Sequence, residues 1–351
     1  MKNKSLLKRI AAMAIVVVSV WLFWPSMPEQ VMMVNKPIVR SAKENPKALP
    51  QKTHEKKTPE LTVMPEKITS NDSATLVAQA YAAELNFPTY SQPLTSNDFD
   101  RLQPNYFNPQ SIPVDDAGTT ISAELSKYRY TYPEPVFATL SGEDIDYAEL
   151  VLVDIESRKS LLTRKFEQNE NSWTAQFDGE RDFPTQLQAT VKARIKGKNI
   201  SIALALKYVD SVATLEGFDP AVNQGADMVI KANLATREKG LYRLRANLFD
   251  ANQQPIAHLV SKEKLGKGNG SIELKAHQSV LKGKQAPFYL STFSIELMSP
   301  APGKPKKYGD SAINQYEIKN FAVSSLSDLP YQPSEQEQQR LQLLQNMAQG
   351  R

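Results

Sequence analysis

The clearest cluster of ionisable side chains in this chain is the stretch GEDIDYAE, which carries Glu143, Asp144, Asp146 and Glu149. Carboxylates at alternate positions can coordinate Ca²⁺ through their oxygen atoms. The D-x-[DN]-x-[DN]-G run of an EF-hand loop is missing, so we interpret the cluster as a solvated acidic turn, with Ca²⁺ binding as the alternative. Two carboxylates could also hydrolyse a glycan, but only if the fold held them at the required separation.

Other catalytic and metal-binding patterns are scarce. The histidines are His54, His258 and His277; the last two could meet across paired strands, but no carboxylate at ligand spacing accompanies them. No HExxH, GxSxG, P-loop or GxGxxG pattern occurs. S-x-x-K occurs at 261–264 and 279–282, as expected by chance in a lysine-rich chain. Because there is no cysteine, thiol catalysis, iron–sulfur clusters and thiolate zinc sites are excluded, and we expect a non-enzymatic protein without a cofactor.

The N-terminus has the features of a membrane anchor. An apolar run from Ile10 to Trp24 follows four basic residues, and a helix over 6–27 reaches roughly 33 Å, enough to span a bilayer. The basic residues predict a cytoplasmic N-terminus, and the aromatic residues that end the run predict an interfacial belt. A cleaved signal peptide would show small residues where this chain has WPSMPEQ. We therefore expect an uncleaved, single-pass inner-membrane anchor over 1–27 and a periplasmic body, with a cleaved signal peptide or a buried core helix as the weaker alternatives.

Residues 28–70 are rich in proline and lysine and lack hydrophobic periodicity, which is typical of a semi-extended linker. We interpret the segment as a tether; an unselected spacer and contact with anionic lipid headgroups are the alternatives. The basic excess is confined to the anchor and this segment. Residues 1–75 hold twelve Lys or Arg and six Asp or Glu, whereas the rest of the chain holds thirty Lys or Arg and thirty-two Asp or Glu, which leaves a net charge of +4. The folded part is therefore slightly acidic, unlike the basic surface of a nucleic-acid binder.

A first domain is expected over 71–211, beginning with a helix and an irregular aromatic segment. A cap among residues 71–73 starts a helix whose apolar face is predicted to contain Leu76, Val77, Ala80, Tyr81 and Leu85. The irregular segment then carries Phe87, Tyr90, Phe99, Tyr106 and Phe107, too many aromatic residues for a disordered linker. We interpret these rings as packing across the first domain, with an ordered binding loop as the alternative.

After residue 116 the pattern changes to alternating strands separated by turn signals such as SGED and KGKN. Strand spacing of roughly 8–14 residues without a helical pattern predicts an antiparallel sandwich. The stretch QLQATVKARI is typical of a half-buried strand, with one apolar face formed by Leu187, Ala189, Val191, Ala193 and Ile195.

A second domain of strands is expected over 212–331, where LYRLRANLFDANQQPIAHLV predicts a hairpin with DANQQP as its turn. The order of this hairpin, a GSIEL strand, an aromatic PFYL strand and a QYEIKNFAV strand resembles Ig-like modules of bacterial envelope proteins. The resemblance covers 212–331 and, more loosely, 119–210, although the paired cysteines and buried tryptophan of antibody domains are absent. It implies a β-sandwich used for spacing or binding, without catalytic residues to carry over.

The last segment, 332–351, predicts a helix. Ser334 and Glu337 fit a capping box, and Leu341, Leu344 and Met347 share a narrow stripe. A short helix that packs on the second domain or frays is one interpretation, and a docking helix for a partner is the other.

These patterns together predict a mainly β protein with an N-terminal transmembrane helix, a flexible linker, two tandem antiparallel Ig-like β-sandwich domains and a short C-terminal helix. We expect a non-enzymatic inner-membrane protein that presents its sandwiches in the periplasm for protein–protein interaction or scaffolding of an envelope or secretion assembly. The alternatives are a glycan-binding module, which needs exposed rings at Tyr90, Phe99 and Tyr106, and a carboxylate-based glycan hydrolase, which needs two facing carboxylates.

Overall fold

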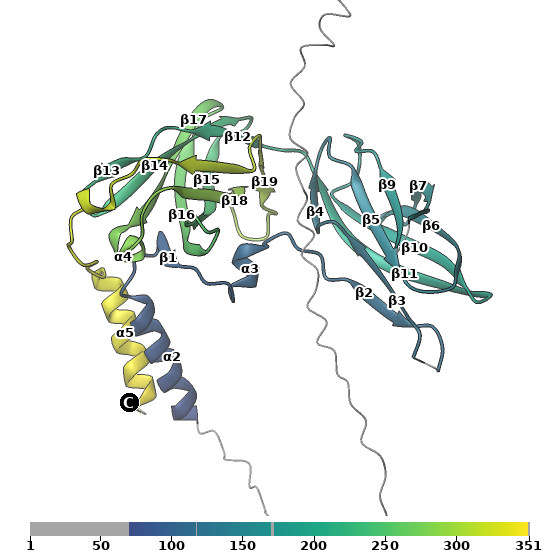
Figure 1. Ribbon diagram of the computed structural model, residues 1–351, viewed down its shortest axis with the longest axis horizontal. Coiled ribbons are helices and arrows are strands. Elements are labelled where there is room, and N and C mark those ends of the chain that lie inside the picture. The colour runs from purple at the N-terminus through teal and green to yellow at the C-terminus, as the bar shows by residue number, and fades with distance from the viewer. Residues whose placement is uncertain (1–69, 117, 170–171, 350–351) are drawn as a thin grey trace, which may run out of the picture. The chain divides into compact units, whose positions relative to one another are not determined.

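The computed structural model describes residues 70–116, 118–169 and 172–349. Contacts divide the chain into two units, Met1–Pro65 and Glu66–Arg351, and every described residue belongs to the second. The predicted anchor and the predicted linker up to residue 69 lie outside the described residues. In the part described, no helix is both long and apolar enough to cross a membrane. This part is mainly β, as the sequence predicts, with two longer helices (Figure 1).

The first β-sandwich is built from two five-stranded sheets, ordered β4-β11-β10-β6-β7 and β2-β3-β5-β9-β8. Neighbouring strands are antiparallel except for the short parallel pair of β4 and β11. The strands are β2 (Gln110–Pro113), β3 (Thr120–Leu125), β4 (Arg129–Thr131), β5 (Val136–Ser141), β6 (Ile145–Asp154), β7 (Ser160–Lys165), β8 (Glu167–Asn169), β9 (Ser172–Phe177), β10 (Gln186–Ile195) and β11 (Lys198–Val209).

Period-two alternation of apolar and polar residues builds the core of this sandwich. The predicted apolar face of β10 is confirmed, since its five residues from Leu187 to Ile195 are all buried. They pack with Tyr130 and Phe177, two of the largest fully buried side chains. At about 25 cal/mol per Å² of apolar surface, this burial is the main term that stabilises a sandwich without disulfides.

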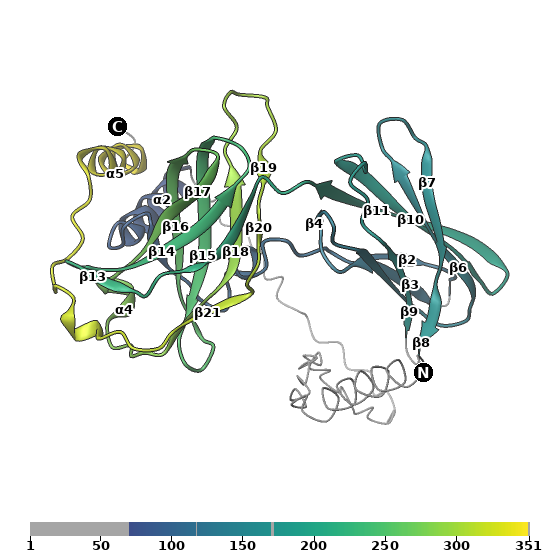
Figure 2. The same ribbon diagram turned by 90° about the horizontal axis from the view of Figure 1, so that it is seen from above.

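The second β-sandwich also consists of two sheets. One is ordered β1-β16-β15-β18-β19, and β21 pairs with β18. The other is ordered β13-β14-β12-β20, and β17 pairs with β14. Figure 2 shows the two layers from above. The strands are β1 (Ser91–Pro93), β12 (Ala213–Phe218), β13 (Val222–Gln224), β14 (Asp227–Thr236), β15 (Gly240–Phe249), β16 (Pro255–Leu265), β17 (Gly268–His277), β18 (Phe288–Leu297), β19 (Lys307–Tyr308), β20 (Asp310–Ser311) and β21 (Gln315–Ile318).

The predicted hairpin with the DANQQP turn is confirmed as β15 and β16. The Asp250 carboxylate accepts the N–H groups of Asn252 at 2.9 Å and Gln254 at 3.0 Å, which is the local bonding that favours Asp at the start of a turn. Gln253 supplies the left-handed backbone, with φ of +58°. Turn chemistry thus set the register here, as the sequence indicates.

The helices are α2 (Ser70–Glu84), α3 (Phe99–Leu102), α4 (Gln278–Leu281) and α5 (Glu335–Ala348), with a 3₁₀ turn, η1 (Val323–Ser325). α2 packs against α5 from the far end of the chain. β1 then pairs with β16, and Phe87 packs on the core of the second sandwich. The stretch from α2 to β1, predicted as the start of the first domain, therefore lies with the second sandwich, while β11 ends at Val209 and β12 begins at Ala213, on either side of residue 211.

Candidate interaction surface

α2 and α5 form an antiparallel helical hairpin that extends from the second sandwich. The N-terminus of α2 and the C-terminus of α5 lie together at its tip (Figures 1 and 2). α5 begins at the predicted capping box, which is confirmed: the Ser334 Oγ accepts the Glu337 N–H at 3.3 Å, and the Glu337 carboxylate accepts the Ser334 N–H at 2.7 Å. These bonds satisfy N–H groups that the helix itself leaves without partners.

A sheltered row on each helix faces the other helix. The less exposed residues of α2 include a row at spacings of four, three and four that continues one residue past the helix, with Thr75 and Ala82 beside it, and those of α5 recur at the same spacings. This is the spacing of two packed helices. The rows are Ala74, Ala78, Tyr81 and, just after α2, Leu85, and on α5 Glu337, Leu341, Leu344 and Ala348.

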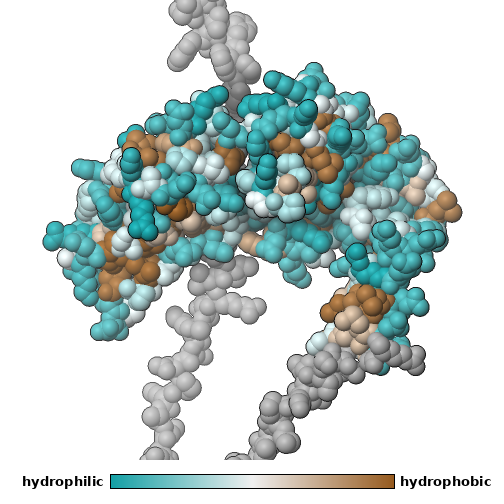
Figure 3. Space-filling view, turned by 180° about the vertical axis from the view of Figure 1, so that it is seen from behind, coloured by the Kyte–Doolittle hydropathy of each residue, from teal (hydrophilic) through white to brown (hydrophobic). Residues whose placement is uncertain are grey.

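Four large apolar side chains of the hairpin remain outside these rows. The exposed fractions are 66% for Leu76, 53% for Val77, 59% for Leu343 and 55% for Met347. Leu76 and Val77 lie at the middle of α2, and Leu343 and Met347 lie in the second half of α5; we call these four side chains the tip patch. Figure 3 shows hydrophobic side chains gathered over the hairpin, at lower right.

The exposures bear on two sequence predictions. Of the predicted apolar face of the first helix, Tyr81 and Leu85 are sheltered as expected, whereas Leu76, Val77 and Ala80 are exposed. On α5, which packs against α2, Leu341 and Leu344 are partly buried. Met347 is the one residue of the predicted stripe that is exposed. Leu343, which the predicted stripe did not include, is exposed as well.

Aromatic and acidic side chains fix the base of the hairpin to the sandwich. The Tyr90 hydroxyl donates to both carboxylate oxygens of Asp227, at 2.9 and 3.0 Å. The Tyr331 hydroxyl donates to the Glu337 carboxylate at 3.0 Å, and the Tyr331 ring lies edge-on to His277, with centroids 6.2 Å apart. Burial, reinforced by the bond to Asp227, raises the pKa of Tyr90, so the phenol stays protonated and donates.

The predicted aromatic residues do not gather at one place. Phe107 is buried in the core of the first sandwich, and Phe87 packs on the second. Tyr90 is half-buried at the base of the hairpin. Phe99 and Tyr106 are 46% and 44% exposed and lie edge to face, with ring centroids 5.0 Å apart. Packing thus accounts for three of the five rings, and only this pair presents itself to solvent.

The acidic cluster does not converge on a cavity. Asp144 pairs with Lys196 at 3.5 Å, and the Asp146 carboxylate accepts the Gly197 N–H at 3.3 Å. Glu149 accepts the Tyr147 hydroxyl at 2.8 Å, and Glu143 is exposed in the turn before β6. Within the described ranges, no three His, Asp or Glu residues are placed to hold a metal ion.

The two histidines of the second sandwich have separate structural partners. The His258 Nδ1 lies 2.7 Å from the Asn247 Oδ1. The His277 Nδ1 lies 2.8 Å from the Ser279 Oγ and accepts the Ser279 N–H at 3.2 Å, which caps α4. A serine beside an imidazole is the start of a nucleophilic pair, but this nitrogen is already occupied as a helix cap. We therefore interpret the pair as structural.

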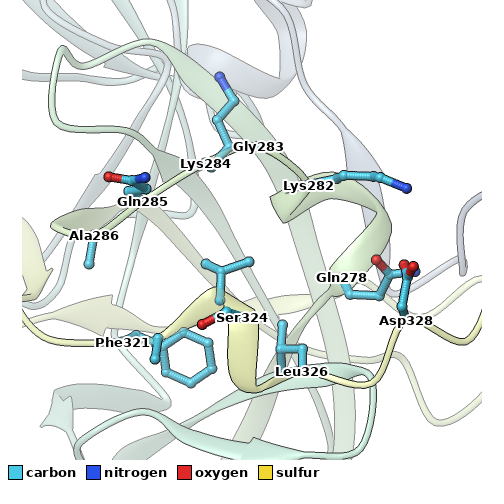
Figure 4. A pocket seen from close by; sticks show the side chains of 12 residues that line it. Gln278, Lys282, Gly283, Lys284, Gln285, Ala286, Phe321, Ser324, Leu326 and Asp328 are labelled. Atoms are coloured by element: carbon cyan, nitrogen blue, oxygen red, sulfur yellow. The ribbon is translucent and has the colours of Figure 1, made fainter.

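A cavity of about 530 Å³ lies between α4 and the segment around η1. Figure 4 shows Phe321 and Leu326 along one wall and the chain from Lys282 to Ala286 along the other. Lys284 is held by Asp250 at 3.6 Å. The volume is in the range of small-ligand pockets. No local pattern predicts this cavity, because its walls come from segments some forty residues apart.

No protein-family model matches the chain, and no curated protein matches it. A DUF4785 family protein from Legionella pneumophila is similar over 50% of this chain and 52% of its own, with 14% identity and a TM-score of 0.37. Alpha-2-macroglobulin from E. coli is similar over 58% of this chain and 15% of its own, with 13% identity and a TM-score of 0.30. Alpha-2-macroglobulin from Salmonella is similar over 60% of this chain and 15% of its own, with 12% identity and a TM-score of 0.29. The chain spans about half the first protein and a small part of the others.

Proposed function

We propose that this is a non-enzymatic, membrane-tethered envelope protein that binds another protein through the tip patch of its helical hairpin. The single observation that carries the proposal is the exposure of Leu76, Val77, Leu343 and Met347 on two packed helices. Hydrophobic side chains gather over the hairpin in Figure 3, and an exposed apolar patch is typical of an interaction site. Full burial of a side chain of this size contributes about 1.5–3 kcal/mol, so covering the patch would supply a large share of a binding free energy.

The position of the hairpin supports this role. α2 starts at residue 70, where the predicted linker ends, so a chain anchored over 1–27 would reach the hairpin tip first. We propose that the body lies in the periplasm of a Gram-negative cell. The two sandwiches, in this account, are Ig-like modules that hold or space the assembly.

The test is photo-crosslinking in cells from single positions in the full chain. A photoreactive residue replaces Leu343 or Val77, and a control replaces Val222, which is equally exposed but lies on β13. We expect protein adducts from the two hairpin positions and none from the control. Equal yields from all three positions, or none from the hairpin, would contradict a docking role.

A second candidate function is glycan binding, and the exposed Phe99 and Tyr106 favour it. Aromatic rings present the apolar face on which a sugar can stack, with polar neighbours available for its hydroxyl groups. Calorimetric titration with envelope glycan fragments tests this candidate, with Phe99→Ala as the variant and Phe137→Ala, another exposed ring, as the control. Heat of binding that only Phe99→Ala removes would support glycan binding; an absence of heat would contradict it.

A further inference from the structure

We propose that the partner of the tip patch is a second copy of this chain, so that two hairpins associate into a four-helix bundle. This inference rests on the proposed docking role and adds the identity of the partner. An isolated pair of helices can shelter only one row on each helix, and the remaining apolar residues need a further layer. Two helical hairpins that cover each other form the usual closed arrangement, a four-helix bundle.

The charges around the patch favour a second copy over an unrelated partner. From Ser73 to Gln79 and from Leu341 to Gln349 there is no Asp, Glu, Lys or Arg. A contact with two-fold symmetry brings each residue close to its own copy or to a neighbour of that copy. Like charges at such positions repel, so an uncharged surface is compatible with self-association. The same surface offers nothing that would steer an acidic or basic partner to it.

The polar residues that surround the patch are also self-complementary. In the second half of α5, around Leu343 and Met347, the glutamines are 342, 345 and, at the C-cap, 349. An amide side chain both donates and accepts hydrogen bonds, so a glutamine can pair with the same glutamine of a second copy. Carboxylate and ammonium groups lack this property, because each is only an acceptor or only a donor.

The outer side of α2 allows close approach of another helix. Ala80 and Ala83 are exposed and follow Leu76 at spacings of four and three, so the three lie on one face. Small side chains let helices approach each other with interaxial distances near the short end of about 8–10 Å. A large apolar residue followed on the same face by two alanines is thus the kind of surface that packs against a second helix.

The chain contains no cysteine, so one introduced cysteine is the only thiol. Met347→Cys is made in the full chain and treated in cells with a short bismaleimide, with Val222→Cys as the control of equal exposure. We expect Met347→Cys to give a product of about 78 kDa, twice the chain mass of 39.2 kDa, containing only this chain, and we expect the control to give at least tenfold less.

Two results would overturn the proposal, and they differ in what else they reject. A product that joins the chain to a different protein, without the 78 kDa species, rejects the second copy but leaves the docking role standing. If neither species forms although mass spectrometry finds the thiol labelled, both proposals fail. Leu343→Asp, a surface change that leaves the packed rows intact, should also abolish the product in the Met347→Cys chain, whereas Leu241→Asp on β15 should not.

Discussion

The Tyr90 hydroxyl donates to both oxygens of the Asp227 carboxylate and thereby ties the segment after α2 to β14. The bond joins residues 137 positions apart in the chain. It stands where the hairpin leaves the sandwich, close to β1 and its pairing with β16. It is one of the contacts that hold the base of the hairpin, beside the Tyr331–Glu337 bond and the pairing of β1 with β16.

Replacing Tyr90 by phenylalanine should therefore loosen the hairpin. The variant removes a hydrogen bond to a charged acceptor and leaves Asp227 without it, at a cost of about 1.5–3 kcal/mol in the free energy of unfolding. Urea denaturation checks the value. Tyr106→Phe is the matched control, since that exposed hydroxyl has no such partner; a loss of similar size in both variants would contradict the role given to Tyr90.

Removal of the helix cap should affect α5 selectively. Ser334→Ala deletes the oxygen that accepts the Glu337 N–H and should cost about 1 kcal/mol, within the range measured for such caps. Hydrogen exchange should show faster exchange in the first turn of α5 and no change in β10. Gln336→Ala, an exposed position in the same first turn, should leave exchange unchanged or slower, because alanine favours helix.

The carboxylate of Glu296 should be essential to the outer face of β15 and β18. It is buried and accepts hydrogen bonds from the guanidinium groups of Arg243 and Arg245. Burial alone would raise its pKa, but the two guanidinium groups outweigh burial and hold the pKa below its ordinary value. Glu296→Gln should destabilise the protein by about 3–5 kcal/mol, because two positive charges lose their partner.

Thermal unfolding of Glu296→Gln tests this expectation. Glu317→Gln is the control, since Glu317 forms a surface pair with Lys319 at 3.7 Å, and such pairs contribute about 0–1 kcal/mol. Glu317 also accepts the Tyr289 hydroxyl at 3.4 Å, a bond that the glutamine carbonyl can keep. If the two variants melt at the same temperature, the buried pair does not have the importance given to it here.

Stability should fall between pH 6.5 and pH 4 through His258. Its Nδ1–H donates to the Asn247 Oδ1, because the Asn247 amide nitrogen donates to the Arg101 carbonyl at 2.7 Å. Burial, with the nearby charges of Arg101 and Arg245, lowers the pKa of His258 to about 4. In the unfolded chain the pKa of His258 is near its ordinary value of 6.5. Between pH 6.5 and pH 4 the unfolded chain therefore binds a proton that the folded chain does not bind, so acid favours unfolding.

The expected loss through His258 is on the order of 2 kcal/mol across this window. Denaturation midpoints of the wild type and His258→Gln at pH 7 and pH 4.5 measure it. The variant should lose less stability than the wild type between the two values. An equal loss in both chains would assign the acid sensitivity to other groups.

Local signals account for the parts of the molecule that the sequence predicted. The face of β10, the turn at Asp250 and the capping box at Ser334 each depend on residues a few positions apart. The predicted packed face of α2 was wrong in part because apolar residues occur on several sides of that helix. Its packing against α5, about 260 residues away in the chain, determines which side is covered. The partners of the acidic cluster, such as Lys196, are likewise set by tertiary structure.

The most direct measurement is the oxidation rate of Met347 by dilute peroxide, in intact cells and in the purified, diluted chain, read by mass spectrometry. Oxidation of methionine follows access of the sulfur to solvent. Met228, which is fully buried, and Met298, which is partly exposed, are internal references. We predict that Met347 oxidises faster than Met298 in the diluted chain but as slowly as Met228 in cells. Fast oxidation in both would mean that nothing covers the tip patch, and would contradict the account.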